Sequence, residues 1–369
     1  MAFILALVTL TVLGLVVTGS FYAARQETRI SVASELTGRA FSVSETGIAD
    51  VLANWQGERF GLLSVGAADQ VTAIAAEGSA LVDVRRISER LYLLDSRASL
   101  YADPQTQHRI AVLTRLRSPM FSAGSAALVL GQLVLEGDAG VTGADFTPLS
   151  WASLCGASGG AQAGVIIPDA TSIATSGGAQ VSGSPPVVEN PGLGAAALVD
   201  FGGISWAELV AVADVHLPSG AFGPVAPQTG ASGTCQTASA SNWGDPNNPD
   251  GPCGRYFPVV HVTGDLQLAA GSVGQGVLLV EGNLHLTDDT RFFGVIVAHG
   301  EITIEGAGVL LAGTVRTQNL TTRNPSTVRE VWVAASRCAI NRAILNNPAL
   351  TRAEPIPARS WIDFTALEG

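Results

Sequence analysis

The chain has 369 residues, of which 47% are hydrophobic and 14% charged, and it contains 42 glycines. That hydrophobic share can offset the entropy of folding, so composition excludes a disordered chain. All 20 basic residues are arginines and 31 residues are acidic, for a net charge of −11, which argues against nucleic-acid binding by charge and against electrostatic adhesion to anionic lipid.

The N-terminal segment Met1–Ala24 contains no charged residue. As a helix it would be about 36 Å long at roughly 1.5 Å per residue, enough to cross a bilayer core of about 30 Å. A cleaved secretory signal needs a basic start, a shorter apolar core and a structural break. No basic residue precedes this run and its helical pattern continues, so we expect a retained helix with weak points at Gly14 and Gly19.

After Arg25 the pattern becomes amphipathic, with apolar residues at three- and four-residue steps. The expected apolar face consists of Ile30, Ala33, Leu36, Ala40, Ile48, Val51, Leu52 and Trp55. We therefore predict one long helix over residues 1–55, with 1–24 as a membrane or filament core and 25–55 as an amphipathic half. Because Arg25 and Arg29 follow the apolar run, the positive-inside rule would retain the body in the cytoplasm unless a short basic leader preceded Met1 and was removed.

This architecture resembles type IV pilins and their type II secretion relatives, and MAFILALVTLTVLGLVV is similar to the PilX-like and tip-pseudopilin branch. The resemblance implies an extracellular filament built from copies of this chain, with the pilus assembly machinery of the inner membrane as a partner. Most pilins have Glu at the fifth mature position, where it neutralises a neighbour's terminal amine, whereas this chain has Leu5. The implied filament-core residues are Met1, Phe3, Ile4, Leu5, Leu7, Leu10, Leu13, Gly14, Val16 and Gly19.

Residues 56–118 are expected to form a pilin-like antiparallel head. Ala80–Val84 and Leu91–Leu94 flank a short polar break, and Arg109–Leu116 alternates apolar with polar residues. Such alternation is typical of a sheet with one buried and one solvated face. The resemblance implies that this head packs on the amphipathic half of the helix.

Residues 119–369 are expected to be β-rich and solenoid-like. In HVTGDLQL, LVEGNLHL and VAHGEITI, the glycines Gly264, Gly282 and Gly300 are spaced 18 residues apart. GQLVL around Gly131 has the same shape and is expected as an outlying strand of the same stack. A glycine turn and an alternating strand at a fixed period indicate stacked solenoid rungs, with an ordinary sandwich as the alternative. The aligned columns are Leu266, Leu284 and Ile302, then Leu268, Leu286 and Ile304, with Gln267, His285 and Thr303 pointing outward between them.

A short helix is expected within residues 203–214, a loop-rich stretch over 217–258, and a strand and helix over 328–334 and 336–345. Together with the long helix and the antiparallel head, these elements define an α+β fold class.

The four cysteines show no CxxC pair and no zinc-ligand spacing. An even number after a membrane-targeted N-terminus suggests disulfides formed outside the cytoplasm. Of the three connectivities, we favour Cys235 with Cys253, because a loop of that length closes easily, which leaves Cys155 with Cys338. Free buried thiols are the alternative.

Three polar patterns are candidates for ligand or modification sites, although no cofactor is expected. Asp245, Asn247 and Asp250 in GDPNNPDG match the first half of a calcium loop but lack its closing Glu, and Asx-Pro-Gly clusters also form plain turns. Asn319 begins a glycosylation sequon. His261, His285 and His299 share no metal-ligand spacing.

The sequence contains neither a nucleophile elbow with a plausible triad nor a phosphate-binding lysine motif, so an enzyme is not expected. The favoured interpretation is a structural subunit of an extracellular type IV pilus-like filament. The alternatives are a minor or tip pilin, a membrane-anchored β-solenoid adhesin, and an anchored polysaccharide-acting enzyme.

Overall fold

The computed structural model describes residues 2–121, 124–156, 159–326, 328–357 and 361–364, without the side chains of residues 2 and 4–8. The chain divides into two compact units. The first comprises Met1–Trp55, Leu62–Leu116 and Ala353–Gly369, and the second comprises Gln56–Gly61 and Arg117–Arg352. The sequence-based division into 1–55, 56–118 and 119–369 differs at two places. Gln56–Gly61 belongs to the second unit, and the chain returns to the first unit from Ala353 onward.

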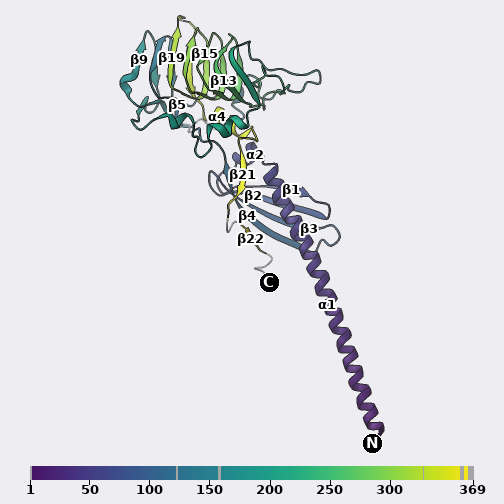
Figure 1. Cartoon of the computed structure of the whole chain (residues 1–369). Coiled ribbons are helices and arrows are strands. Elements are labelled where there is room, and N and C mark those ends of the chain that lie inside the picture. Colours follow the sequence, from purple (N-terminus) through teal and green to yellow (C-terminus); the bar gives the residue numbers. More distant parts are fainter. Residues whose placement is uncertain (1, 122–123, 157–158, 327, 358–360, 365–369) are drawn as a thin grey trace. The chain divides into compact units, whose positions relative to one another are not determined.

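The first unit combines the long helix α1 (Ala2–Ala53) with an antiparallel sheet (Figure 1). Strands β1 (Ala68–Ile74), β2 (Gly78–Arg86), β3 (Leu91–Leu100) and β4 (Gln107–Arg117) pair in chain order. The late strands β21 (Arg352–Pro355) and β22 (Trp361–Asp363) both pair with β4, and β22 does so antiparallel through Trp361 and Val112. The expected antiparallel head is confirmed, and its last strands come from the opposite end of the sequence.

The amphipathic half of α1 packs on this sheet. Ala40, Ile48 and Val51 are buried as expected, whereas Ile30 is exposed because the apolar stripe extends beyond the sheet. A Cβ at Gly47 would lie 2.6 Å from the Cβ of Ala80, so glycine permits the close approach of helix and strand. Buried hydroxyls complete the contact, since Ser44 Oγ donates to the carbonyl of His108 and Ser96 Oγ donates to the carbonyl of Ser44.

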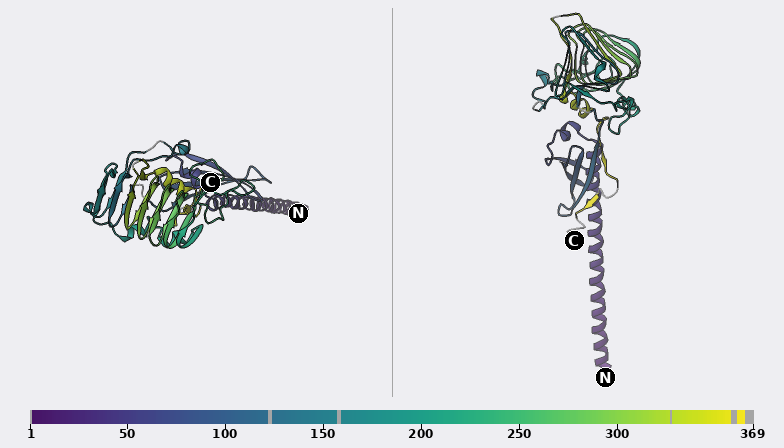
Figure 2. Two further views of the ribbon diagram at one scale, coloured as in Figure 1. Left: turned by 90° about the horizontal axis from the view of Figure 1, so that it is seen from above. Right: turned by 90° about the vertical axis from the view of Figure 1, so that its left-hand side faces the viewer.

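The second unit is a parallel β-solenoid, whose strands stack side by side in Figure 2. The short helices of this unit are α2 (Gly57–Gly61), α3 (Trp206–Ala211) and α4 (Arg337–Leu345), with 3-10 turns η1 (Leu149–Trp151), η2 (Ala170–Ser172) and η3 (Ala195–Leu198). Its sheet contains β5 (Ser125–Val129), β6 (Leu133–Gly137), β7 (Ala139–Thr142), β8 (Ala163–Ile167), β9 (Ile173–Ser176), β10 (Gln180–Ser182), β11 (Val187–Glu189), β12 (Val215–Phe222), β13 (Val259–Leu268), β14 (Val273–Val280), β15 (Leu284–Leu286), β16 (Arg291–Ala298), β17 (Glu301–Glu305), β18 (Leu310–Thr317), β19 (Asn319–Asn324) and β20 (Val331–Ala335).

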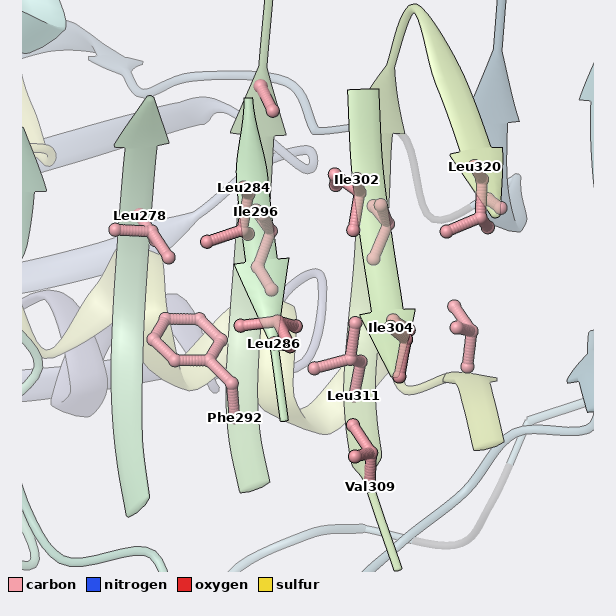
Figure 3. Close-up of a cluster of buried hydrophobic side chains, with 14 of the residues drawn as sticks. Leu278, Leu284, Leu286, Phe292, Ile296, Ile302, Ile304, Val309, Leu311 and Leu320 are labelled. Carbon is pink, nitrogen blue, oxygen red and sulfur yellow. The ribbon is translucent and has the colours of Figure 1, made fainter. Parts of the chain in front are cut away.

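The register confirms the 18-residue period. Leu266 pairs with Leu284, Leu284 with Ile302, and Ile302 with Leu320. These side chains are fully or almost fully buried, and Figure 3 shows Leu284, Ile302 and Leu320 in line on neighbouring strands inside the solenoid. The GQLVL segment joins the same column, because Leu320 pairs with Leu133 in parallel. An unbroken apolar interior therefore runs through successive rungs.

The spatial order of the rungs differs from chain order. Strand β6 lies between β19 and β9, and β20 lies between β18 and β7. The chain thus builds β5–β11 first, begins again with β12 at the other end of the stack, and returns through β19. Strand β20 then pairs with β18 on one side and with β7 on the other, and so joins the part built first to the part built second.

A second apolar cluster covers one outer side of the solenoid. Helix α4 contacts β14, β16 and β18 and contributes Ala339, Ile340 and Ala343 to this cluster. Trp151 is completely buried, and its indole nitrogen donates to the carbonyl of Pro246 at 2.7 Å. The solenoid therefore has buried residues on both sides of these strands, which explains why their sequences are apolar without alternation.

Candidate functional site

The N-terminal half of α1 carries a continuous run of exposed apolar side chains. Phe3, Leu10 and Val16 are 78%, 74% and 62% exposed. Leu15, Val16 and Val17 are all exposed although consecutive helical residues point about 100° apart, so the helix is uncovered on every side. Further exposed apolar side chains on this half are Val12, Leu13, Phe21 and Tyr22.

The structure describes the side chains of some, but not all, of the predicted filament-core residues. Phe3, Leu10, Leu13 and Val16 are exposed, and a Cβ at Gly14 or Gly19 would meet nothing within 4 Å. Met1 and the side chains of Ile4, Leu5 and Leu7 lie outside the described residues. Within the part of the chain that the structure describes, no helix is both long and apolar enough to span a membrane.

Charges of both signs follow the apolar half along α1. Arg25, Arg29 and Arg39 are nearly balanced by four acidic residues, which are Glu27, Glu35, Glu45 and Asp50. Glu35 and Arg39 form an exposed pair at 2.6 Å, one helical turn apart. When two copies of such a helix lie side by side with a shift along their axes, positive residues of one can face negative residues of the other.

The structure pairs the cysteines as the sequence favours. Cys235 bonds to Cys253 within the loop between β12 and β13, with their Cα atoms 4.9 Å apart. Cys155 bonds to Cys338 at the start of α4, across 183 residues of sequence, with Cα atoms 5.7 Å apart. The second bond ties the segment after η1 to α4 and therefore holds the outer apolar cluster together.

The GDPNNPDG segment forms a turn inside the first disulfide loop. Asp245 Oδ1 accepts hydrogen bonds from the backbone N–H groups of Asn247 and Asn248, at 3.2 and 3.1 Å. Asn247 and Asp250 are exposed. These bonds are those of an ordinary Asx turn. Calcium binding by Asp245, Asn247 and Asp250 stays a prediction.

Asn319 stands in a ladder of side chains at the turn of each rung. Its Oδ1 accepts the backbone N–H of Gln132 at 2.8 Å. In the same way Asp265 accepts from the N–H of Asn283 at 2.7 Å, and Asn283 accepts from the N–H of Glu301 at 2.8 Å. The amide oxygen of Asn319 thus helps to set the register of adjacent rungs, and its glycosylation stays a prediction.

An open groove of about 520 Å³ crosses the outer face of β13, β15, β17 and β19. Gln267, His285 and Thr303, which the repeat predicts to point outward, line this groove. Charged residues that were not predicted to lie there line it as well. Its polar lining consists of Asp265, Gln267, Asn283, His285, Glu301, Thr303, Glu305, Thr321 and Arg323. The same 18-residue alignment could have revealed these residues, because Glu305 and Arg323 are paired in adjacent rungs.

Hydrogen bonds connect the groove side chains across rungs. Glu305 accepts from Arg323 Nη1 at 3.0 Å and lies 3.2 Å from His285 Nε2, while Thr321 Oγ1 donates to Glu301 at 2.6 Å. The three carboxylates of the groove outnumber its single arginine. Such a surface offers hydrogen-bond acceptors and donors in fixed positions. Its excess of negative charge disfavours the binding of anionic ligands.

Two charged groups in the second unit, buried Arg316 and exposed Glu208, are held by hydrogen bonds to covering segments. Arg316 is 5% exposed, and burial lowers its pKa to about 10, so it stays cationic at neutral pH. Its guanidinium donates to the carbonyls of Ala197 and Met120, at 3.0 and 3.2 Å. At α3, the backbone N–H of Ser205, then Arg117, then the Ser205 hydroxyl lower the pKa of Glu208 to about 2. Both groups hold segments that cover the solenoid.

Comparison with known proteins gives little. No protein-family model matches the chain, and no curated protein matches it. Among solved structures, the chain is similar to the crystal structure of competence-associated pilin ComZ from Thermus thermophilus. The two are 12% identical over 89% of this chain and 97% of that chain, with a TM-score of 0.25. At that score the likeness supports no statement about this chain's function.

Proposed function

We propose that this chain is a structural subunit of an extracellular type IV pilus-like filament, assembled through its N-terminal helix. The observation that carries the proposal is the contrast along α1. Its last turns bury one face against the sheet, through residues such as Ala40, Ile48 and Val51, whereas the N-terminal half exposes apolar side chains on every side. An exposed apolar surface of this extent marks an interaction site.

The proposed occupant of that surface is the same helix in other copies. A helix exposed on all sides cannot be covered by one groove, whereas neighbouring helices around a shared axis can cover every face. Gly14 and Gly19 leave open space where another helix could approach closely. The balanced charges from Arg25 to Asp50 suit a shifted identical neighbour, and repeated heterologous contacts of one kind generate a filament.

The finer assignments belong to the same proposal. Export and assembly would use a pilus assembly machinery in the inner membrane, and the β-rich parts would be displayed outside the cell. We assign a principal rather than a minor or tip role, although Leu5 departs from the Glu of most pilins. A principal subunit would be the most abundant protein in purified filaments, whereas a tip subunit would be present in few copies.

Thiol cross-linking tests the proposed helix contact. All four native cysteines are in disulfides, so Val16→Cys introduces a single free thiol. Treating surface filaments with bis-maleimides of graded length should produce covalent dimers, because neighbouring helices in a shared core, although shifted, keep equivalent residues within reach of the longer reagents. Val328→Cys is the matched control, since Val328 is 87% exposed but lies in the solenoid unit. Filaments in which Val16→Cys yields no dimers, or no more than Val328→Cys, would contradict the proposal.

A second candidate function, recognition of a neutral polyhydroxylated ligand such as a glycan, is favoured by the solenoid groove. Adjacent rungs lie about 4.8 Å apart, so the groove repeats its polar columns along the stack. Carboxylates, amides and hydroxyls can satisfy the alternating donors and acceptors of a sugar chain. In this reading the chain would be a β-solenoid adhesin, whether or not it also builds the filament.

Calorimetric titration of the full chain with neutral oligosaccharides tests the groove. Thr303→Arg should abolish binding by filling the groove floor with a long side chain, because Thr303 lies in the outward column. Thr234→Arg, at an exposed position in the loop between β12 and β13, should bind like the unmodified chain. Equal affinity in both variants, or no heat with any oligosaccharide, would eliminate this second function.

A further inference from the structure

Two histidines that are 45 residues apart in sequence meet on adjacent strands. In the parallel register of β12 and β13, His216 pairs directly with His261. Their Nδ1 atoms are 3.3 Å apart, and the ring planes are nearly perpendicular at 84°. Sequence spacing could not reveal the pair, because β12 lies outside the 18-residue repeat and a long loop separates the two strands.

A carboxylate determines where His261 holds its proton. His261 Nε2 lies 3.0 Å from Glu281 Oε1, and an ionised carboxylate only accepts hydrogen bonds. The neutral imidazole of His261 therefore carries its hydrogen on Nε2 and directs the lone pair of Nδ1 toward His216. This arrangement, a histidine oriented by a carboxylate on its far nitrogen, is the one that metal-ligating histidines commonly show.

The separation of the two nitrogens fits a shared metal ion. Nitrogen ligands lie about 2.0–2.1 Å from zinc in a tetrahedral site, which places two such ligands about 3.3–3.4 Å apart. His261 is only 4% exposed and is held in place, whereas His216 is exposed and leaves the position open to solvent. Among the described residues no group of three His, Cys, Asp or Glu side chains could hold a metal, so water or a second molecule would complete the coordination.

We propose that His216 and His261 form a binding site for a borderline divalent transition-metal ion, with Glu281 as the residue that orients His261. Two imidazole nitrogens select Zn²⁺, Ni²⁺ or Cu²⁺ over calcium and magnesium, which prefer oxygen ligands. The bound ion ties β12 to β13 and so stabilises one end of the solenoid. This site is independent of the helix and of the groove.

Trp206 provides a reporter beside the proposed site. Its ring centroid is 6.4 Å from that of His261 and 3.9 Å from that of His299. Titration of the full chain with NiCl₂ should quench the fluorescence of Trp206 and raise the unfolding temperature by several degrees, because the ion binds the folded state only. Trp206→Phe should remove the saturable quenching and keep the thermal shift.

Histidine variants decide whether the ion sits between the two rings. His216→Ala should weaken nickel binding at least tenfold without affecting folding, since His216 is exposed. His261→Gln should do the same, with a lower unfolding temperature in the absence of metal. His285→Ala is the matched control, because its imidazole pairs with Glu305 in the groove and the variant should bind like the unmodified chain. Absence of saturable quenching, or equal affinities in the unmodified chain and His216→Ala, would overturn the proposal.

Discussion

Gly294→Ala is expected to destabilise the solenoid by about 3–5 kcal/mol, the sum of a backbone-strain and a steric contribution. Gly276, Gly294 and Gly313 occupy one column of adjacent rungs. All three have positive φ angles, of 113°, 140° and 144°. A Cβ at Gly294 would collide with the carbonyl oxygen of Gly276, so alanine is excluded by backbone conformation and by space together. Chemical denaturation followed by circular dichroism measures the change.

Gly223→Ala is the control for this prediction. Gly223 does not have a positive φ angle, and an added Cβ would meet nothing within 4 Å. Its replacement should change the free energy of unfolding by less than about 0.5 kcal/mol. Similar stabilities of Gly294→Ala and Gly223→Ala would show that the rungs do not approach as closely as the glycine column requires.

Val16→Asp is expected to abolish filament assembly while leaving the subunit folded. Val16 is 62% exposed in the single chain, so aspartate there disturbs no intramolecular contact. In a packed bundle of helices the same carboxylate would be buried without a partner, at a cost of several kcal/mol per subunit. Electron microscopy of cell surfaces and the fraction of protein pelleted with filaments measure assembly. The denaturation curve of the purified subunit should match that of the unmodified chain.

Val328→Asp provides the matched control, because it makes the same substitution at an exposed valine of the solenoid unit. Its filaments should be as numerous as those of the unmodified chain. Wild-type numbers of filaments from Val16→Asp would show that the apolar half of α1 is not buried by assembly. Loss of filaments with both variants would indicate a general effect of added charge.

Local patterns in the sequence were sufficient for the long helix and for the rungs. Helical periodicity identified Ala40, Ile48 and Val51 as buried, and the spacing of Gly264 and Gly282 predicted the register that the parallel strands adopt. These features follow from hydrogen bonds and side-chain alternation within one element or between successive rungs. The information needed lies within a few tens of residues of the sequence.

Pairing between segments that are distant in the sequence left no local pattern. The likeness of GQLVL to the repeat placed Leu133 in the stack, but no local pattern indicated that it pairs with Leu320, or that β22 returns to pair with β4. The prediction that Ile30 belongs to the buried face of α1 was wrong, because the sheet does not extend to that residue. Gln267, His285 and Thr303 point outward as predicted, but only the folded structure shows that acidic residues such as Glu301 and Glu305 line the same groove.

The sequence by itself therefore determined the long helix, the period of the solenoid and the favoured cysteine pairing. Tertiary structure alone decided the order in which rungs stack, the closure of the first sheet by the C-terminal strands, and the meeting of His216 with His261. The physical reason is that parallel rungs have similar shapes and present similar edges. Which edges pair depends on where the intervening segments leave backbone groups and apolar columns uncovered, and that is a property of the whole folded chain.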